Sequence, residues 1–185
     1  MIMRISDIDK NFEVKATVSK DGVDFFDVDK APFEIFGIFK EGGRYRRMPE
    51  AVAKSVSAGV YSLHANTAGG RLRFITDSDY IAIKADMDGV GKMQHFAFTG
   101  SIGFDLYVDN EYHSTFIPPY DITDGYESSK ELGEKKLREI CINFPLYSNV
   151  KELSVGLREG SVIKEALPYR NEKPIVYYGS SVTQG

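Results

Sequence analysis

The chain has 185 residues, with 23 basic and 27 acidic side chains and a formal net charge of −4. Hydrophobic residues make up 42% and charged residues 27%, which is typical of a globular protein with a buried core. The acidic balance argues against a nucleic-acid-binding protein, no apolar run is long enough to span a membrane, and the single Cys141 excludes an internal disulfide.

The first part of the chain alternates apolar groups with turns. Residues 21–28 and 33–47 have the pattern of short strands separated by Gly and Asp. Residues 48–60 have the only helical pattern, since Pro49 suits a first helical position and an acidic residue follows it near the positive end of the helix dipole. We expect Gly59 to end this helix.

The central part predicts further strands. Residues 71–87 have the pattern of a β-hairpin, with Asp77 and Ser78 as its turn. The inward faces of its two strands are expected to hold Leu72, Phe74 and Thr76, and Ile81, Ile83 and Ala85. The next predicted elements are strands 95–100 and 102–108, a turn at Asp109 and Asn110, and a strand over 112–117.

Two more alternating strands, 136–144 and 151–159, follow a polar loop at 118–136. Their inward residues are expected to be Ile140, Ile142 and Phe144, and Leu153, Val155 and Leu157. Many short strands with little helical periodicity predict a mainly β fold, an antiparallel β-sandwich or jelly roll. We expect this domain to cover residues 1–167 and a polar, Pro-bounded linker to cover 168–174.

The last segment, residues 175–185, has a different pattern. Residues 175–178 form the continuous apolar run of a strand that is buried on both faces of a parallel sheet. A small-residue turn, Gly179-Ser180-Ser181, comes directly after it. Sites of open α/β sheets lie at the carboxyl ends of strands, so the segment predicts the first strand and active-site turn of a second domain. Thr183 excludes the Gly-x-Ser-x-Gly elbow, and a Gly-Ser-Ser sequence by itself is usually only a turn.

Two motifs give the sequence a family resemblance. The run PIVYYGSSVTQG resembles the first block of the SGNH/GDSL hydrolases, a strand followed by G-D-S-x-T-x-G. Ser181 falls at the nucleophile, Ser180 replaces the usual Asp, and the supporting positions are Gly179, Thr183 and Gly185. The run GFDLY at 103–107 resembles the G-x-D-L-Y signature of an N-terminal domain in one branch of these esterases.

The resemblance covers most of residues 45–185 and implies an N-terminal accessory β-sandwich of an ester hydrolase that acts on acyl esters, with carbohydrate esters as one substrate class. In that family the Ser works with the His of an Asp-x-x-His block, and a Gly and an Asn complete the oxyanion hole. None of the three histidines, His64, His95 and His113, has an Asp-x-x-His context. The chain is therefore expected to stop just after the nucleophile block and to be inactive alone.

Several residues have both a functional and a structural interpretation. His64 and His95 could face a substrate cleft, although hydrogen-bonded structural histidines are the more usual case. Asp105 lies within an apolar strand, where a carboxylate needs a partner, so we expect it to pair with a backbone turn or with Arg71 or Arg73.

The loop at 118–127 supports an alternative function. Tyr120 and Tyr126 stand among carboxylates there, as in loops that hold sugars, and the alternative is a stand-alone carbohydrate-binding jelly roll. The absence of Trp weakens this alternative, and the acidic spacing does not fit an EF-hand loop.

The expected partners follow from these interpretations. They are the missing SGNH catalytic domain, a carbohydrate ester, and a second copy of the chain that pairs through the exposed apolar strand 175–178. No cofactor, metal, nucleic acid or membrane is expected. Without a secretory signal, a cytoplasmic location is the default expectation.

Overall fold

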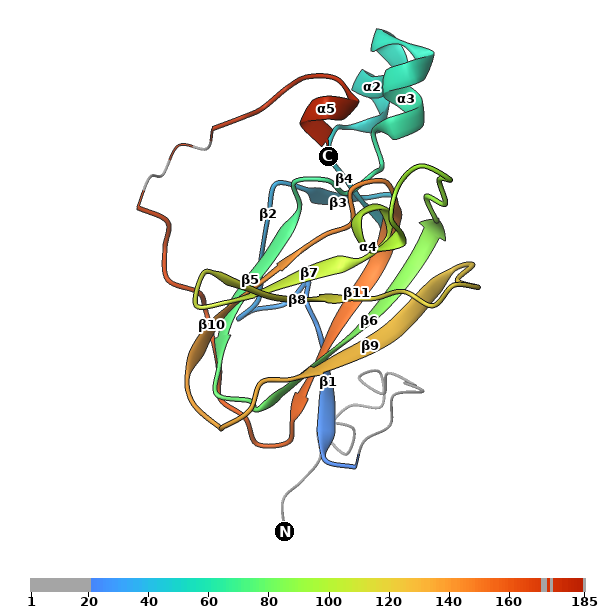
Figure 1. Ribbon diagram of the computed structural model, residues 1–185. Helices are drawn as coiled ribbons and strands as arrows, with labels where there is room; N and C mark the ends of the chain where they lie inside the picture. The colour runs from blue at the N-terminus through green and yellow to red at the C-terminus, as the bar shows by residue number, and fades with distance from the viewer. Residues whose placement is uncertain (1–20, 171–172, 174, 185) are drawn as a thin grey trace.

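Residues 21–170, 173 and 175–184 are described by a computed structural model (Figure 1). Two antiparallel sheets face each other around one core, as expected for a β-sandwich. The first sheet has the order β1-β11-β6-β9. Its strands are β1 (Val23–Asp27), β11 (Asn149–Arg158), β6 (Tyr80–Gly89) and β9 (Gly125–Glu131).

The second sheet has the order β12-β5-β10-β7-β8, and β2 also pairs with β5. These elements are β12 (Ile163–Lys164), β5 (Arg71–Thr76), β10 (Arg138–Asn143), β7 (Phe104–Val108), β8 (Glu111–Phe116) and β2 (Glu34–Phe36). A small ribbon of β3 (Phe39–Glu41) and β4 (Arg44–Arg46) lies beside the sandwich. The turn between β7 and β8 is as expected, because Asp109 and Asn110 both have positive φ, as a two-residue hairpin turn requires.

The expected hairpin of residues 71–87 is wrong, since β5 and β6 belong to opposite sheets. The connection turns a corner that is held by the buried Ser78. Its hydroxyl donates to the Tyr80 carbonyl at 2.5 Å and accepts from the Arg158 amide at 3.1 Å. The alternation of apolar and polar residues determines which face of a strand is buried, but it does not determine which strand is its neighbour. Both predicted inward faces are therefore confirmed even though the predicted pairing is wrong.

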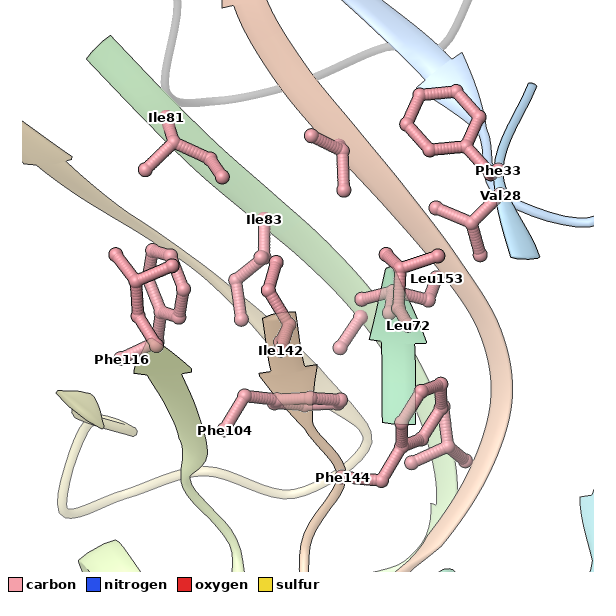
Figure 2. Close-up of a cluster of buried hydrophobic side chains, with 14 of the residues drawn as sticks. Val28, Phe33, Leu72, Ile81, Ile83, Phe104, Phe116, Ile142, Phe144 and Leu153 are labelled. Atoms are coloured by element: carbon pink, nitrogen blue, oxygen red, sulfur yellow. The ribbon is translucent and has the colours of Figure 1, made fainter. Parts of the chain in front are cut away.

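The core lies between the two sheets. Figure 2 shows Ile81 and Ile83 of β6 in one cluster with Phe104, Phe116 and Ile142 of the other sheet. The inward residues expected in β10 and β11 are all buried as well. The apolar face of each sheet is thus covered by the other, which is why the short strands are stable.

The helical expectations need two corrections. The segment 48–60 forms two helices, α2 (Glu50–Val56) and α3 (Ala58–Leu63), because Ser57 is extended and its hydroxyl accepts from the Val60 amide at 3.2 Å. Gly59 therefore lies inside α3 and does not end a helix. The strand expected at 95–100 is instead a loop followed by α4 (Phe98–Ser101). Among the described residues, no helix is both long and apolar enough to cross a membrane.

Candidate functional site

The GFDLY run forms β7 and its approach, and its first residue makes a close backbone contact. A Cβ at Gly103 would lie 2.3 Å from the Thr99 carbonyl oxygen and 2.8 Å from the Thr115 methyl group. Only glycine avoids both contacts. Phe104 and Leu106 then point into the core, where both are fully buried.

The polar residues of the same run hold neighbouring β8. The Asp105 carboxylate accepts a hydrogen bond from the Thr115 hydroxyl at 2.6 Å, and Tyr107 packs edge-on against Tyr112 at 5.7 Å between ring centroids. Asp105 is structural, as expected, but its partner is Thr115 and not Arg71 or Arg73. Arg73 instead forms an ion pair with Glu139. The residues of this signature therefore stabilise the pairing of β7 with β8 and the core beneath them.

The predicted nucleophile turn leads into a single helical turn, α5 (Ser181–Gln184). Ser181 is the first residue of α5 and is exposed. A Cβ at Gly179 would lie 2.1 Å from the Thr183 hydroxyl oxygen, so a side chain at the first supporting position would force the second to shift. Gly185 lies outside the described residues. The turn presents the Ser181 hydroxyl to solvent, which a nucleophile requires.

The α5 turn contacts one end of the sandwich, beside α2 and α3 (Figure 1). The Tyr147 hydroxyl donates to the Ser181 carbonyl oxygen at 3.3 Å. Arg47, between β4 and α2, donates to the Gln184 side-chain oxygen at 3.1 Å. Burial lowers the pKa of Arg47, and nearby Tyr147 acts in the opposite direction. The predicted nucleophile turn is thus held by polar groups of the sandwich.

The apolar run 175–178 is in neither sheet, and its four side chains are 79–80% exposed. The strand expected here is one buried on both faces of a parallel sheet, which needs hydrogen-bonding neighbours and a layer covering each face. Neither sheet of the sandwich supplies them at this position. That these residues begin a second domain, after a linker at 168–174, stays a prediction.

The three histidines do not form a site with Ser181 in the described structure. His64 is buried, with one ring nitrogen bound to Arg46 and the other 2.5 Å from the Tyr61 carbonyl oxygen, so both ring nitrogens are already engaged within the sandwich. His95 and His113 are exposed, and His113 is bonded to the neighbouring Ser114 hydroxyl at 3.0 Å.

The polar loop expected at 118–136 is wrong in part, because β9 (Gly125–Glu131) forms within it, and its two tyrosines have different surroundings. Tyr120 is 87% exposed and its ring stacks on Phe98 at 5.7 Å. Tyr126 is buried, and its hydroxyl donates to the Phe116 carbonyl at 2.7 Å. Burial also raises the pKa of Tyr126. The hydroxyl of Tyr126 is therefore already used inside the protein, and the glycan contact expected of these two tyrosines stays a prediction.

Sequence reasoning missed the residues that hold the turn: Arg47, Asn66, Tyr147 and Gln184. Arg47, Asn66 and Tyr147 lie in loops far apart in the chain, so no periodicity relates them to Gln184 of α5. The one available signal was the position of Gln184 inside the motif. In the described part of the chain, no group of three or more His, Cys, Asp or Glu side chains is placed to hold a metal ion.

Comparison with known proteins identifies relatives of the sandwich. The family described as the GxDLY N-terminus of SGNH-hydrolase-type esterases matches residues 12–163. No curated protein matches the chain. A solved structure described as a GDSL-like lipase, from Bacteroides ovatus, is 20% identical with a TM-score of 0.68, covering 78% of this chain and 43% of that one.

A second solved structure is the salicylyl-acyltransferase SsfX3 from a tetracycline biosynthetic pathway. It is 17% identical with a TM-score of 0.62, covering 82% of this chain and 44% of that one. At such identities the likeness shows a shared fold. The chain spans less than half the length of either structure.

Proposed function

The chain belongs to the GxDLY N-terminal domains of SGNH-hydrolase-type esterases, and from this we propose that it is the sandwich part of a serine ester hydrolase whose nucleophile is Ser181. The observation that carries the proposal is the placement of Ser181, which is exposed at the start of a turn fastened to the sandwich. Gly179 and Thr183 give that turn its shape. The proposed substrate is an acyl ester, with carbohydrate esters as the class to test first.

In this proposal the sandwich does not supply the general base or the oxyanion donors that ester hydrolysis needs. A serine hydroxyl becomes a strong nucleophile only when a base takes its proton and preorganised donors stabilise the oxyanion. His64 is engaged by Arg46 and the Tyr61 carbonyl, and no Asp-x-x-His sequence occurs in residues 1–185. The base and the remaining oxyanion donors would come from a catalytic α/β domain, which would also cover the exposed run 175–178.

We expect residues 1–185 alone to hydrolyse p-nitrophenyl acetate at the rate of buffer, because none of the three histidines forms a site with Ser181 in the described structure. The measurement is release of nitrophenolate at several protein concentrations, with the Ser181→Ala variant as the control. Turnover well above background that disappears in Ser181→Ala would contradict the inactivity of the sandwich alone.

A second candidate function is glycan binding, and the exposed ring of Tyr120 favours it. Flat aromatic rings stack on sugar faces, and stacking on Phe98 holds this ring in place. If the loop binds a glycan, Tyr120→Ala should weaken binding about tenfold. Affinity electrophoresis in xylan or mannan measures this, with the exposed Tyr112→Ala as the matched control. No retardation of the unmodified chain in any polysaccharide would remove this candidate.

A further inference from the structure

The side chain of Gln184 is bound on all sides by the sandwich. Its oxygen accepts from Arg47 Nη2 at 3.1 Å, and its nitrogen donates to Asn66 Oδ1 at 3.2 Å and to the Leu146 carbonyl oxygen at 2.8 Å. The amide thus uses its acceptor and both of its donor hydrogens. The neighbouring Val182, by contrast, is 89% exposed.

The three groups that bind this amide come from separate segments, and the sandwich holds each of them independently. Arg47 Nη2 also donates to the Leu63 carbonyl at 2.6 Å. Asn66 Nδ2 donates to Asn149 Oδ1 at 2.9 Å, which leaves its oxygen free to accept. The loop carrying Leu146 is tied to α4 by two backbone hydrogen bonds of 3.1 and 3.3 Å. We call Arg47, Asn66 and the Leu146 carbonyl the amide socket. Because these three groups are held in place without Gln184, binding its amide costs little conformational entropy in the sandwich.

The geometry of the socket favours an amide over the closest alternatives. A carboxylate at position 184 would accept from Arg47, but its second oxygen would oppose the oxygens of Asn66 and Leu146. An apolar chain of the same length would leave the buried part of Arg47 without this acceptor. Only an amide presents an acceptor to the cation and donors to the two oxygens.

Gln184 also lies close to the proposed nucleophile. Its backbone amide donates to the Ser180 carbonyl at 3.3 Å, within the same helical turn that begins at Ser181. The Tyr147 hydroxyl donates to the Ser181 carbonyl, and its ring is packed edge-on against Phe96 at 5.3 Å. Fixing the Gln184 amide therefore fixes the position of Ser181 relative to the sandwich.

We propose that Gln184 is a positioning residue, a latch whose amide enters the socket of Arg47, Asn66 and Leu146 and so sets the place of the nucleophile turn on the sandwich. The meaning of that position for catalysis rests on the proposed function. The latch itself is a property of residues 1–185 and is measured without any reaction.

The test uses the 185-residue chain labelled with ¹⁵N, and its readout is the backbone order parameter of residues 182–184. We expect values near 0.85, as in the strands, for the unmodified chain, and a fall below about 0.6 in Gln184→Met. Val182→Ala is the matched control and should leave the order parameters at 183 and 184 unchanged. The β7 and β10 signals in the same spectra report whether the sandwich stays folded.

A pH series distinguishes a specific latch from loose packing. In Gln184→Glu the turn should be undocked at pH 7 and regain order near pH 4, because a protonated carboxyl can again donate to the Leu146 carbonyl. Gln184→Met should stay undocked at both pH values. An ordered turn in Gln184→Met, or a docked Gln184→Glu at pH 7, would overturn the latch. If the turn undocks as expected while Ser181 proves dispensable for ester hydrolysis, the latch stands and the proposed function fails.

Discussion

Replacing Phe104 by Ala is expected to lower the free energy of unfolding by about 3–5 kcal/mol. The ring is fully buried in β7 and packs against the rings of Phe144 at 5.4 Å and Tyr126 at 6.3 Å. Its removal loses the transfer free energy of the ring and leaves a cavity between two sheets that cannot both move inward. Urea denaturation followed by circular dichroism measures this change as a lower midpoint concentration of urea, and the dependence of the free energy on urea concentration should stay the same.

The matched control for Phe104→Ala is Ile117→Ala, which removes an apolar side chain just after β8. Ile117 is 60% exposed, so its replacement should change the free energy of unfolding by no more than about 0.5 kcal/mol. A loss of under about 1 kcal/mol for Phe104→Ala would mean that β7 is not part of the core. That result would contradict the structural role assigned to the GFDLY run.

Ser181→Ala is expected to lower kcat by about a thousandfold or more in a protein that also contains the Asp-x-x-His block, with little change in KM. The Ser181 hydroxyl is the nucleophile in this proposal, and Ala keeps the backbone of the turn. The measurement is steady-state kinetics on p-nitrophenyl acetate and on an acetylated oligosaccharide.

Ser180→Ala is the control for that experiment, since it removes the adjacent hydroxyl. The Ser180 side chain accepts a hydrogen bond from the Val182 amide at 3.4 Å, so it supports the local turn. We expect this variant to lose less than about tenfold in kcat. If Ser180→Ala shows the large loss in kcat and Ser181→Ala the small one, the nucleophile has been assigned to the wrong hydroxyl.

Alternation along the chain predicted the sandwich and its inward faces because one side of each strand is covered by the opposite sheet. It could not predict which strands pair. Residues 71–87 show why: the same pattern fits a hairpin and a corner between sheets, and the buried Ser78 decides for the corner. The run 95–100 was too short for its period to separate a strand from a helical turn.

The sequence predicted a turn after residue 178, and Gly179 and Thr183 lie close together there within five residues. Their role in supporting a nucleophile stays a prediction. The surroundings of the turn could not be predicted in the same way. Arg47, Asn66 and Tyr147 meet it only through the fold, from segments that the sequence does not relate. Tyr126 shows the opposite case, a residue of suitable type whose strand carries it into the core.

The most direct measurement for the proposed hydrolase is the site of a covalent label. A protein that continues through the Asp-x-x-His block is treated with a fluorophosphonate, which reacts with activated serines, and the labelled peptide is mapped by mass spectrometry. We predict that the label is on Ser181, and that residues 1–185 alone are not labelled under the same conditions. A label on another residue, or equal labelling of Ser181 in the 185-residue chain, would contradict the proposal.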